Sequence, residues 1–376
     1  MASIKRRLYA ALFPVYRTLF PTRVARGAYV PRTAKRVLVV RHDRLGDMIL
    51  TTPVFDLLHE LAPGVEVDVL ASPRNATLLQ GDERIEQVWT DDGTWGGLWR
   101  LRGALRARSY DAVFSVIPGR SVRGGWTAGV VSHAHTHRVS TWRPKRYHGF
   151  FTRVVRLPRS LATAHVSRQM SYVVRAAFGP IGRDATAASE LAAPIRVHVP
   201  DAARASAARY LEAEDIGVFV TINLRSAATA RSWSAPGAIA LIPSLLAAHP
   251  ALHVVLVPGP ADAAEAQGVR DAVGSPRVHL FDPAAPLLTL AALVERAAMM
   301  ITPDTMTLHL AVATGRPVLS LHTTTDGNVP DLWKAVGVPS RALVAPSGEG
   351  VSAISTDAVA AAFAALVREA GIKLEG

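Results

Sequence analysis

The chain has 376 residues, of which 49% are hydrophobic and 19% charged, so wholesale disorder is excluded and about two domains are expected. The absence of cysteine excludes disulfides and cysteine–zinc sites. Lysine and arginine outnumber aspartate and glutamate by 42 to 30, and the net charge of +12 favours an anionic partner such as phosphate, nucleic acid or an acidic lipid surface. No apolar run reaches the roughly 18 residues that a transmembrane helix needs.

Residues 1–34 differ from the rest because they mix basic and aromatic side chains and contain Pro14 and Pro21. A secretory signal fits poorly, since the apolar part is short, is broken by proline and lacks a clear cleavage site. Two interpretations stay open. The segment could rest on an anionic membrane as an interfacial anchor, or it could pack as a helix on the first domain.

From residue 36 onward, strand and helix patterns alternate. In the first half, strands are predicted at 37–40, 66–70, 85–89 and 111–117, with helices at 48–61 and 98–106. In the second half, strands are predicted at 218–223, 253–257, 277–281 and 299–302, with helices at 236–248, 261–273 and 287–298. Such βαβ repetition implies parallel sheets.

The simplest α/β architecture is two Rossmann-like domains facing each other across a cleft. A stretch rich in alanine and proline at 181–200 indicates the boundary between them. The predicted division is an extension at 1–34, one domain at 35–190, a second at 191–355, and a C-terminal alanine-rich helical segment at 356–376.

The most informative segment is the predicted strand at 37–40 with the charged turn that follows it. Asp43, Gly46 and Asp47 lie where the strand ends, and open α/β sheets bind their ligands at the carboxyl ends of strands. These carboxylates are therefore candidates for chemistry. The alternative is that Asp43 or Asp47 only caps the helix that follows.

Two segments of the second half also follow strands. Asp304 and Thr305 begin a helix, whose free N–H groups and threonine hydroxyl could hold a phosphate, and His309 lies one turn later on the same face. The alternative there is an ordinary helix cap with a structural histidine. The loop at 223–233 combines Ser226 with Arg231, and arginine pairs well with phosphate, although a solvated loop would look the same.

A basic region follows the predicted strand at 111–117. Its charges, interspersed with Trp126 and Trp142, suit an anionic saccharide or a plain solvated face, whereas no recognised nucleic-acid module is present. The basic residues are Arg120, Arg123, Arg138, Arg143, Lys145 and Arg146. Three histidines, His133, His135 and His137, would share one face of an extended strand, so zinc is conceivable but not favoured.

Together these segments resemble glycosyltransferase family 9, the ADP-heptose:lipopolysaccharide heptosyltransferases. The resemblance rests on Asp43-Arg-Leu-Gly-Asp47 after a valine-rich strand, Arg231 two residues before Trp233, and Asp304-Thr305 with His309, in that order. It covers residues 36–332. It implies a GT-B fold, with the acceptor held by the first domain and the nucleotide sugar by the second. It also suggests that the C-terminal helical segment at 356–376 could pack back on the first domain.

The resemblance also implies a role for each matching residue. Asp47 corresponds to the family's proposed general base, Arg231 and Ser226 to donor-contacting positions, and Asp304, Thr305 and His309 to residues that hold the donor sugar and pyrophosphate. Two departures concern the donor site: Met306 stands where the family usually has glycine, and Arg231 where it often has lysine. On the acceptor side we expect Asp43, Arg120, Arg123 and Arg143.

The function expected from this resemblance is inverting transfer of a heptose, or a related sugar, from an ADP-sugar to a hydroxyl of an anionic lipopolysaccharide-core acceptor. No cofactor and no metal are expected. The expected location is cytoplasmic, with peripheral contact to the inner face of the membrane. Two alternatives are a transferase of another nucleotide sugar acting on a protein or small molecule, and a catalytically silent GT-B binding protein.

Overall fold

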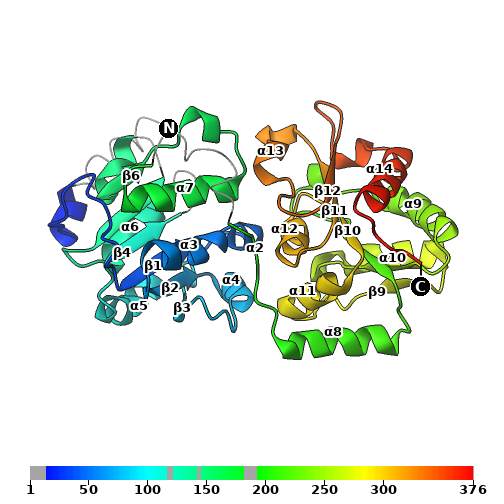
Figure 1. Cartoon of the computed structure of the whole chain (residues 1–376), viewed down its shortest axis with the longest axis horizontal. Helices are drawn as coiled ribbons and strands as arrows, with labels where there is room; N and C mark the ends of the chain where they lie inside the picture. Colours follow the sequence, from blue (N-terminus) through cyan, green and yellow to red (C-terminus); the bar gives the residue numbers. More distant parts are fainter. Residues whose placement is uncertain (1–13, 117–121, 142–144, 182–192, 376) are drawn as a thin grey trace. The chain divides into compact units, whose positions relative to one another are not determined.

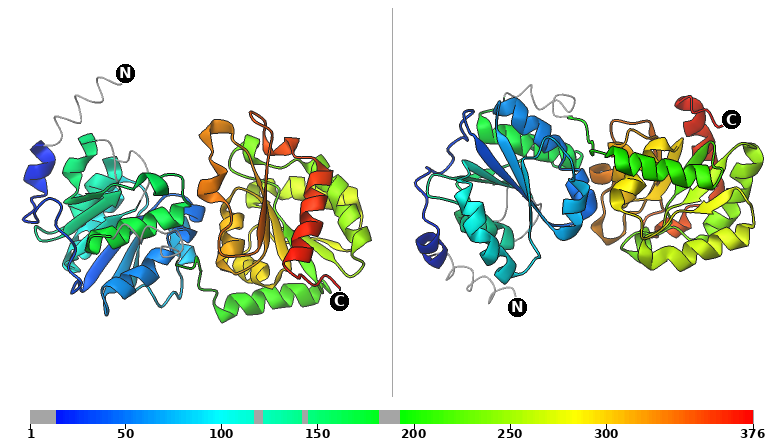
Figure 2. Two further views of the ribbon diagram at one scale, coloured as in Figure 1. Left: turned by 45° about the horizontal axis from the view of Figure 1, so that its top comes forward. Right: turned by 90° about the horizontal axis from the view of Figure 1, so that it is seen from below.

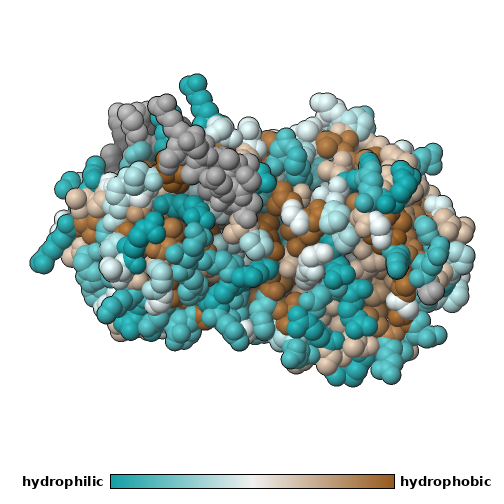
Figure 3. Space-filling view, viewed as in Figure 1, coloured by the Kyte–Doolittle hydropathy of each residue, from teal (hydrophilic) through white to brown (hydrophobic). Residues whose placement is uncertain are grey.

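The structure is a computed structural model, and it describes residues 14–116, 122–141, 145–181 and 193–375. The chain divides into two compact units, Met1–Ala193 and Pro194–Gly376, each with its own sheet (Figure 1). Hydrophilic residues cover much of the face shown in Figure 3. In the part of the chain that the structure describes, no helix is long and apolar enough to cross a membrane.

The described part of the first unit contains one six-stranded sheet in the order β3-β2-β1-β4-β5-β6, and every neighbouring pair is parallel. Its strands are β1 (Arg36–Arg41), β2 (Glu66–Ala71), β3 (Gln87–Thr90), β4 (Ala112–Ser115), β5 (His137–Thr141) and β6 (Arg153–Val155). Its helices are α2 (Leu45–Ile49), α3 (Pro53–Leu61), α4 (Pro73–Leu78), α5 (Trp95–Ala107), α6 (Val122–Val131) and α7 (Val166–Phe178). Helices cover both faces of the sheet, which explains why residues 37–40 of β1 form an unbroken apolar run (Figure 2).

The second unit repeats this topology in its own sheet, whose described strands run β12-β11-β10-β7-β8-β9, again all parallel. The strands are β7 (Phe219–Ile222), β8 (His253–Leu256), β9 (Val278–Leu280), β10 (Met299–Pro303), β11 (Val318–His322) and β12 (Ser340–Val344). The helices are α8 (Asp201–Ala213), α9 (Ala235–Ala248), α10 (Ala263–Val273), α11 (Leu287–Arg296), α12 (Met306–Ala313), α13 (Pro330–Trp333) and α14 (Thr356–Glu369).

Both sheets therefore have the Rossmann strand order, in which the first and fourth strands are neighbours. The order reverses between β1 and β4 in the first unit and between β7 and β10 in the second. Ligands of such sheets bind outside the carboxyl ends of the two strands at this switch point. The loops after these four strands are thus the places to look for chemistry.

Three sequence expectations differ from the structure. The single helix predicted at 48–61 is two helices, α2 and α3, because Pro53 begins a new helix at its first position. The extended strand on which His133, His135 and His137 would share a face is not formed, since β5 starts only at His137 and a turn occupies the residues before it. The apolar face of α14 lies in the hydrophobic core of the second unit, which corrects the expectation that residues 356–376 pack back on the first domain.

The N-terminal segment belongs to the body of the first unit in its described part, residues 14–34. Tyr16 and Phe20 are buried in the same core as Leu38 and Val40 of β1. The Tyr16 hydroxyl donates to the carbonyls of Gly125 and Phe150. Of the two interpretations left open from the sequence, the described part of the segment agrees with packing on the first domain.

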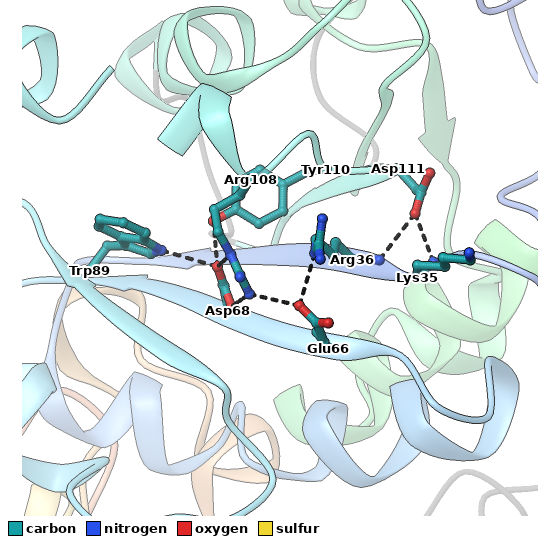
Figure 4. Close-up of polar contacts among 8 residues, drawn as sticks. All are labelled: Lys35, Arg36, Glu66, Asp68, Trp89, Arg108, Tyr110 and Asp111. Atoms are coloured by element: carbon teal, nitrogen blue, oxygen red, sulfur yellow. Dashed lines mark hydrogen bonds and ion pairs between the residues drawn. The ribbon is translucent and has the colours of Figure 1, made fainter. Parts of the chain in front are cut away.

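A buried carboxylate ties β2 to its neighbours on the sheet. Asp68 is fully buried and accepts hydrogen bonds from Trp89 Nε1 at 3.1 Å and from the Tyr110 hydroxyl at 2.6 Å, as Figure 4 shows. The Arg108 guanidinium lies 2.9 Å from the same carboxylate and also contacts Glu66. The charge of Asp68 is thereby compensated, as a buried carboxylate requires.

Candidate active site

In the first unit, Arg41 organises the turn after β1. Its side chain is fully buried, with Nε 3.0 Å from Asp43 Oδ1 and Nη2 3.0 Å from Asp47 Oδ1. These are ion pairs by distance, although the N–H directions depart from hydrogen-bond geometry. Nη1 donates to the Val116 carbonyl after β4 at 2.7 Å. Arg41 thus joins both strands of the switch point and places two carboxylates beside it.

Neither aspartate is a helix cap. Arg44 is the N-cap residue of α2 and no side chain caps this helix end, while Asp47 stands in its first turn. The capping interpretation of the turn is therefore wrong for this chain. Asn75, fully buried, donates to the Arg41 and Asp43 carbonyls and fixes the backbone of the turn.

The two carboxylates sit in different surroundings. Burial raises the pKa of Asp43 to about 6, the Arg41 charge opposes this rise, and the neighbouring Asp47 charge adds to it. The side chain of Asp47 is 15% exposed and that of Asp43 27% exposed, so both have access to solvent. A pair of carboxylates on one arginine can accept a proton from a bound hydroxyl.

Of the expected acceptor residues, Asp43 lies in the turn beside Arg41. Arg120 and Arg143 lie outside the described residues. Arg123 is placed with both oxygens of the buried Asp91 within 2.7 Å of its Nη2, so its charge is already balanced. Burial lowers the pKa of His42, which is close to the charges of that pair. The acceptor contact of Arg123 stays a prediction.

Arg138, which the sequence placed in the same basic region, is a core residue. It is 2% exposed, and its guanidinium donates to the Tyr16 hydroxyl and to the carbonyls of Phe20 and Pro21. Among the histidines, His133 contacts the Arg106 carbonyl at 2.8 Å. Within the described ranges, no group of three metal-binding side chains is found.

In the second unit, the two predicted donor segments lie at one switch point. The loop at 223–233 follows β7, and Asp304 to His309 follow the adjacent strand β10. Asn223 connects them, because its Nδ2 donates to Thr307 Oγ1 at 3.0 Å and to Thr302 Oγ1 at 3.3 Å. Ser226 Oγ adds a longer contact of 3.4 Å to the Asp304 carbonyl. Sequence reasoning missed the role of Asn223, although it stands directly at the strand end.

The start of α12 has unused polar groups. Thr305 is the N-cap residue in an extended conformation, and its hydroxyl makes no capping hydrogen bond. The buried Asp304 instead accepts from Asn328 Nδ2 at 3.1 Å. Met306 is partly exposed at the first helical position, and His309 is buried beside the Trp333 ring, at 6.5 Å between centroids. The ordinary-cap interpretation is therefore not realised, and the N–H groups of this helix start are open to an anion.

The two arginines of the 223–233 loop differ. Arg225 Nε lies 3.2 Å from Glu265 and 3.7 Å from Asp262, so its charge is used within the unit. Arg231 is half-buried, and its guanidinium has no ion pair or hydrogen bond to any residue that the structure describes. Arg231 is the cation of this loop that a ligand can engage.

Neighbouring backbone holds the loop in place. A Cβ atom at Gly350 would come within 2.9 Å of the Ala230 carbonyl oxygen, so only glycine allows this approach. Ser352 Oγ donates to the Ser232 carbonyl at 3.1 Å. The position of Arg231 is thus set by contacts more than a hundred residues away in the sequence.

Comparison with known proteins agrees with this geometry. The family model of glycosyltransferase family 9 (heptosyltransferase) matches residues 98–345, about two thirds of the chain. The chain belongs to glycosyltransferase family 9. It is accordingly a glycosyltransferase with a GT-B fold. The match contains Arg231 and Asp304 to His309, whereas Asp43 and Asp47 precede it.

Solved structures share the fold. A family 9 glycosyltransferase from Veillonella parvula has a TM-score of 0.77 at 19% identity, covering 91% of this chain and 99% of that one. Heptosyltransferase II of E. coli has a TM-score of 0.71 at 17% identity, and the match covers 89% of this chain and 99% of that one. E. coli heptosyltransferase WaaC with ADP has a TM-score of 0.65 at 19% identity, and the match covers 90% of this chain and 100% of that one. No curated protein matches the chain.

Proposed function

We propose that the second unit binds the donor, a nucleoside diphosphate sugar, at its switch point. The observation that carries this proposal is the hydrogen-bonded link through Asn223 between the loop of Arg231 and the start of α12. An uncompensated arginine and a helix start with open N–H groups suit a diphosphate. Structures of the E. coli relative WaaC hold ADP or an ADP-2-deoxy-2-fluoro heptose, and we therefore propose ADP-heptose or a related sugar as donor.

We further propose that Asp47 is the general base of an inverting transfer. The acceptor oxygen forms a bond to the anomeric carbon while the bond from that carbon to the diphosphate breaks, and Asp47 takes the proton of the hydroxyl. Arg41 supports this role because its Nη2 lies 3.0 Å from Asp47 Oδ1 and so fixes the position of the carboxylate at the end of β1. The diphosphate leaves with its negative charge held by Arg231 and the Thr305 N–H, with His309 beside them, and no metal is required.

The acceptor is proposed to be a hydroxyl of an anionic, lipopolysaccharide-core-type saccharide. The support is chemical, since the net charge of the chain is +12 and the sequence after β4 is rich in arginine. We assign to Asp43, which pairs with the same arginine as the proposed base, the role of orienting the acceptor hydroxyl.

The test is a transfer assay read by mass spectrometry, with ADP-heptose as donor and core saccharides as acceptors. Asp47→Asn is expected to lower kcat by about 10²- to 10⁴-fold while ADP affinity, measured by calorimetry, stays unchanged. Arg231→Gln is expected to weaken ADP binding, and a chelator is expected to change neither result. Transfer at the wild-type rate by Asp47→Asn would exclude this base, and absence of any nucleotide binding would exclude the donor site.

A further inference from the structure

Two helices of the first unit expose large apolar side chains. On α5, Trp95 is 56% and Trp99 61% exposed, one helical turn apart. On the helix at 14–19, Val15 and Leu19 are 49% and 56% exposed, again one turn apart. Tryptophan is normally well covered in a folded protein, so two such exposures on one helix face need a reason.

Aromatic contacts through α6 connect these two helices. Trp95 contacts Trp126 of α6, with ring centroids 6.3 Å apart, and Trp126 lies 5.5 Å from Tyr16. The inward faces of both helices share a core that contains Tyr16 and Leu98, and their outward faces carry the exposed side chains.

The same surface is basic. Helix α5 carries Arg100, Arg102 and Arg106 and no acidic residue. The Arg102 guanidinium lies over the Trp99 ring at 5.2 Å, and Arg17 is exposed on the other helix. Asp92 pairs with Arg100 and Asp91 with Arg123, whereas Arg102 and Arg17 have no acidic partner among the residues that the structure describes. We call Val15, Arg17, Leu19, Trp95, Trp99, Arg100 and Arg102 the tryptophan surface.

We propose that the tryptophan surface docks the protein on an anionic lipid bilayer. Tryptophan has an amphipathic ring that settles at the level of the lipid headgroups. The aliphatic part of an arginine side chain can lie along apolar surface while its guanidinium contacts lipid phosphate. Apolar and electrostatic contacts with the bilayer can therefore be made by the same residues. Gly96, Gly103 and Ala104 are exposed and have no long side chain, so the α5 backbone can approach a membrane plane closely. Membrane docking does not depend on which donor is bound, so this proposal is independent of the proposed function.

Vesicle co-sedimentation tests the proposal with the full-length protein. We expect it to bind vesicles of equal parts phosphatidylglycerol and phosphatidylcholine but not vesicles of phosphatidylcholine alone. Trp99→Ser is expected to weaken binding to the mixed vesicles by about tenfold, and Arg100→Gln with Arg102→Gln to weaken it further. Val344→Ser and Arg209→Gln, which change exposed residues of the second unit, are the matched controls and should bind like the wild type.

Two further measurements distinguish vesicle binding by the tryptophan surface from binding by the N-terminal basic residues and from self-association. Replacing residues 5–7, Lys-Arg-Arg, by glutamine in the full chain should leave most of the vesicle binding. If this variant loses vesicle binding while Trp99→Ser binds like the wild type, the assignment to α5 is overturned. The thermal midpoint of each variant shows that it is folded. Self-association that requires Trp99, in a protein that binds no vesicle, would also overturn the proposal.

Discussion

Arg41 and Asp47 form an ion pair at the carboxyl end of β1, with Arg41 Nη2 3.0 Å from Asp47 Oδ1. Because the arginine is fully buried and the carboxylate is mostly covered, solvent screens the attraction between the two charges only weakly. The pair also connects β1 to β4 through the Val116 carbonyl. The proposed base is therefore held by a residue that supports the sheet at the same time.

Replacement of Arg41 tests this relationship. Arg41→Gln leaves Asp43 and Asp47 without their shared cation and is expected to lower the free energy of unfolding by about 3 kcal/mol. Urea denaturation measures the loss. Arg36→Gln is the matched control, because its ion pair with Glu66 is well exposed and its removal should change stability far less. Equal losses in the two variants would contradict a special role for Arg41.

The pKa of Asp43 predicts a pH dependence of stability. Because its pKa is raised from 3.8 to about 6 in the folded protein, the folded state binds the proton more tightly than the unfolded state. Stability from this group is present below pH 3.8 and is lost as the pH rises toward 6. Asp43→Asn should remove this loss and raise the free energy of unfolding at neutral pH by up to about 3 kcal/mol. An unchanged pH profile of unfolding would show that Asp43 is not the group responsible.

Asn223 is predicted to support donor binding without contacting the donor. Asn223→Ala removes the link between Thr302, Thr307 and the 223–233 loop, which should cost about 1–3 kcal/mol of stability. ADP affinity should fall as well, because the two loops lose their fixed relation. Calorimetry and thermal unfolding give the two values. Ser244→Ala, a partly buried hydroxyl of α9 remote from this link, is the control and should leave ADP affinity unchanged.

Gly350 offers a steric test of the same loop. Gly350→Ala places a Cβ 2.9 Å from the Ala230 carbonyl oxygen, so the backbone before Arg231 has to move. We expect a destabilisation of about 1–3 kcal/mol and weaker ADP binding. Gly217→Ala is the control, since its Cβ would meet no atom within 4 Å. Unchanged ADP binding by Gly350→Ala would show that the position of this loop is not critical.

The buried Asp68 is expected to matter for stability alone. Tyr110→Phe removes the 2.6 Å hydrogen bond and should cost about 1–2 kcal/mol, whereas Asp68→Ala leaves Trp89, Tyr110 and Arg108 without their acceptor and should cost about 3–5 kcal/mol. Thermal and urea unfolding measure both. Sugar transfer by the folded fraction should be unchanged, and a specific loss of transfer would contradict a purely structural role.

Local pattern predicted much of this protein. The apolar run before Arg41, the helical spacing after Pro236 and the strand before Asp304 are set by neighbours in the sequence, and each element forms close to its predicted place. The end of a strand and the start of a helix are also local features. The sequence therefore determined where carboxylates and the free N–H groups of a helix start would be available.

Only the tertiary structure decided which of them meet. Strand order brings the loops after β7 and β10 together, and no local period encodes that order. Long-range contacts likewise decide that Arg138 is a core residue bound to Tyr16 and that Arg41 holds both aspartates. The physical reason is that a charged side chain looks the same in sequence whether water or a buried partner compensates it, and only the fold supplies the partner.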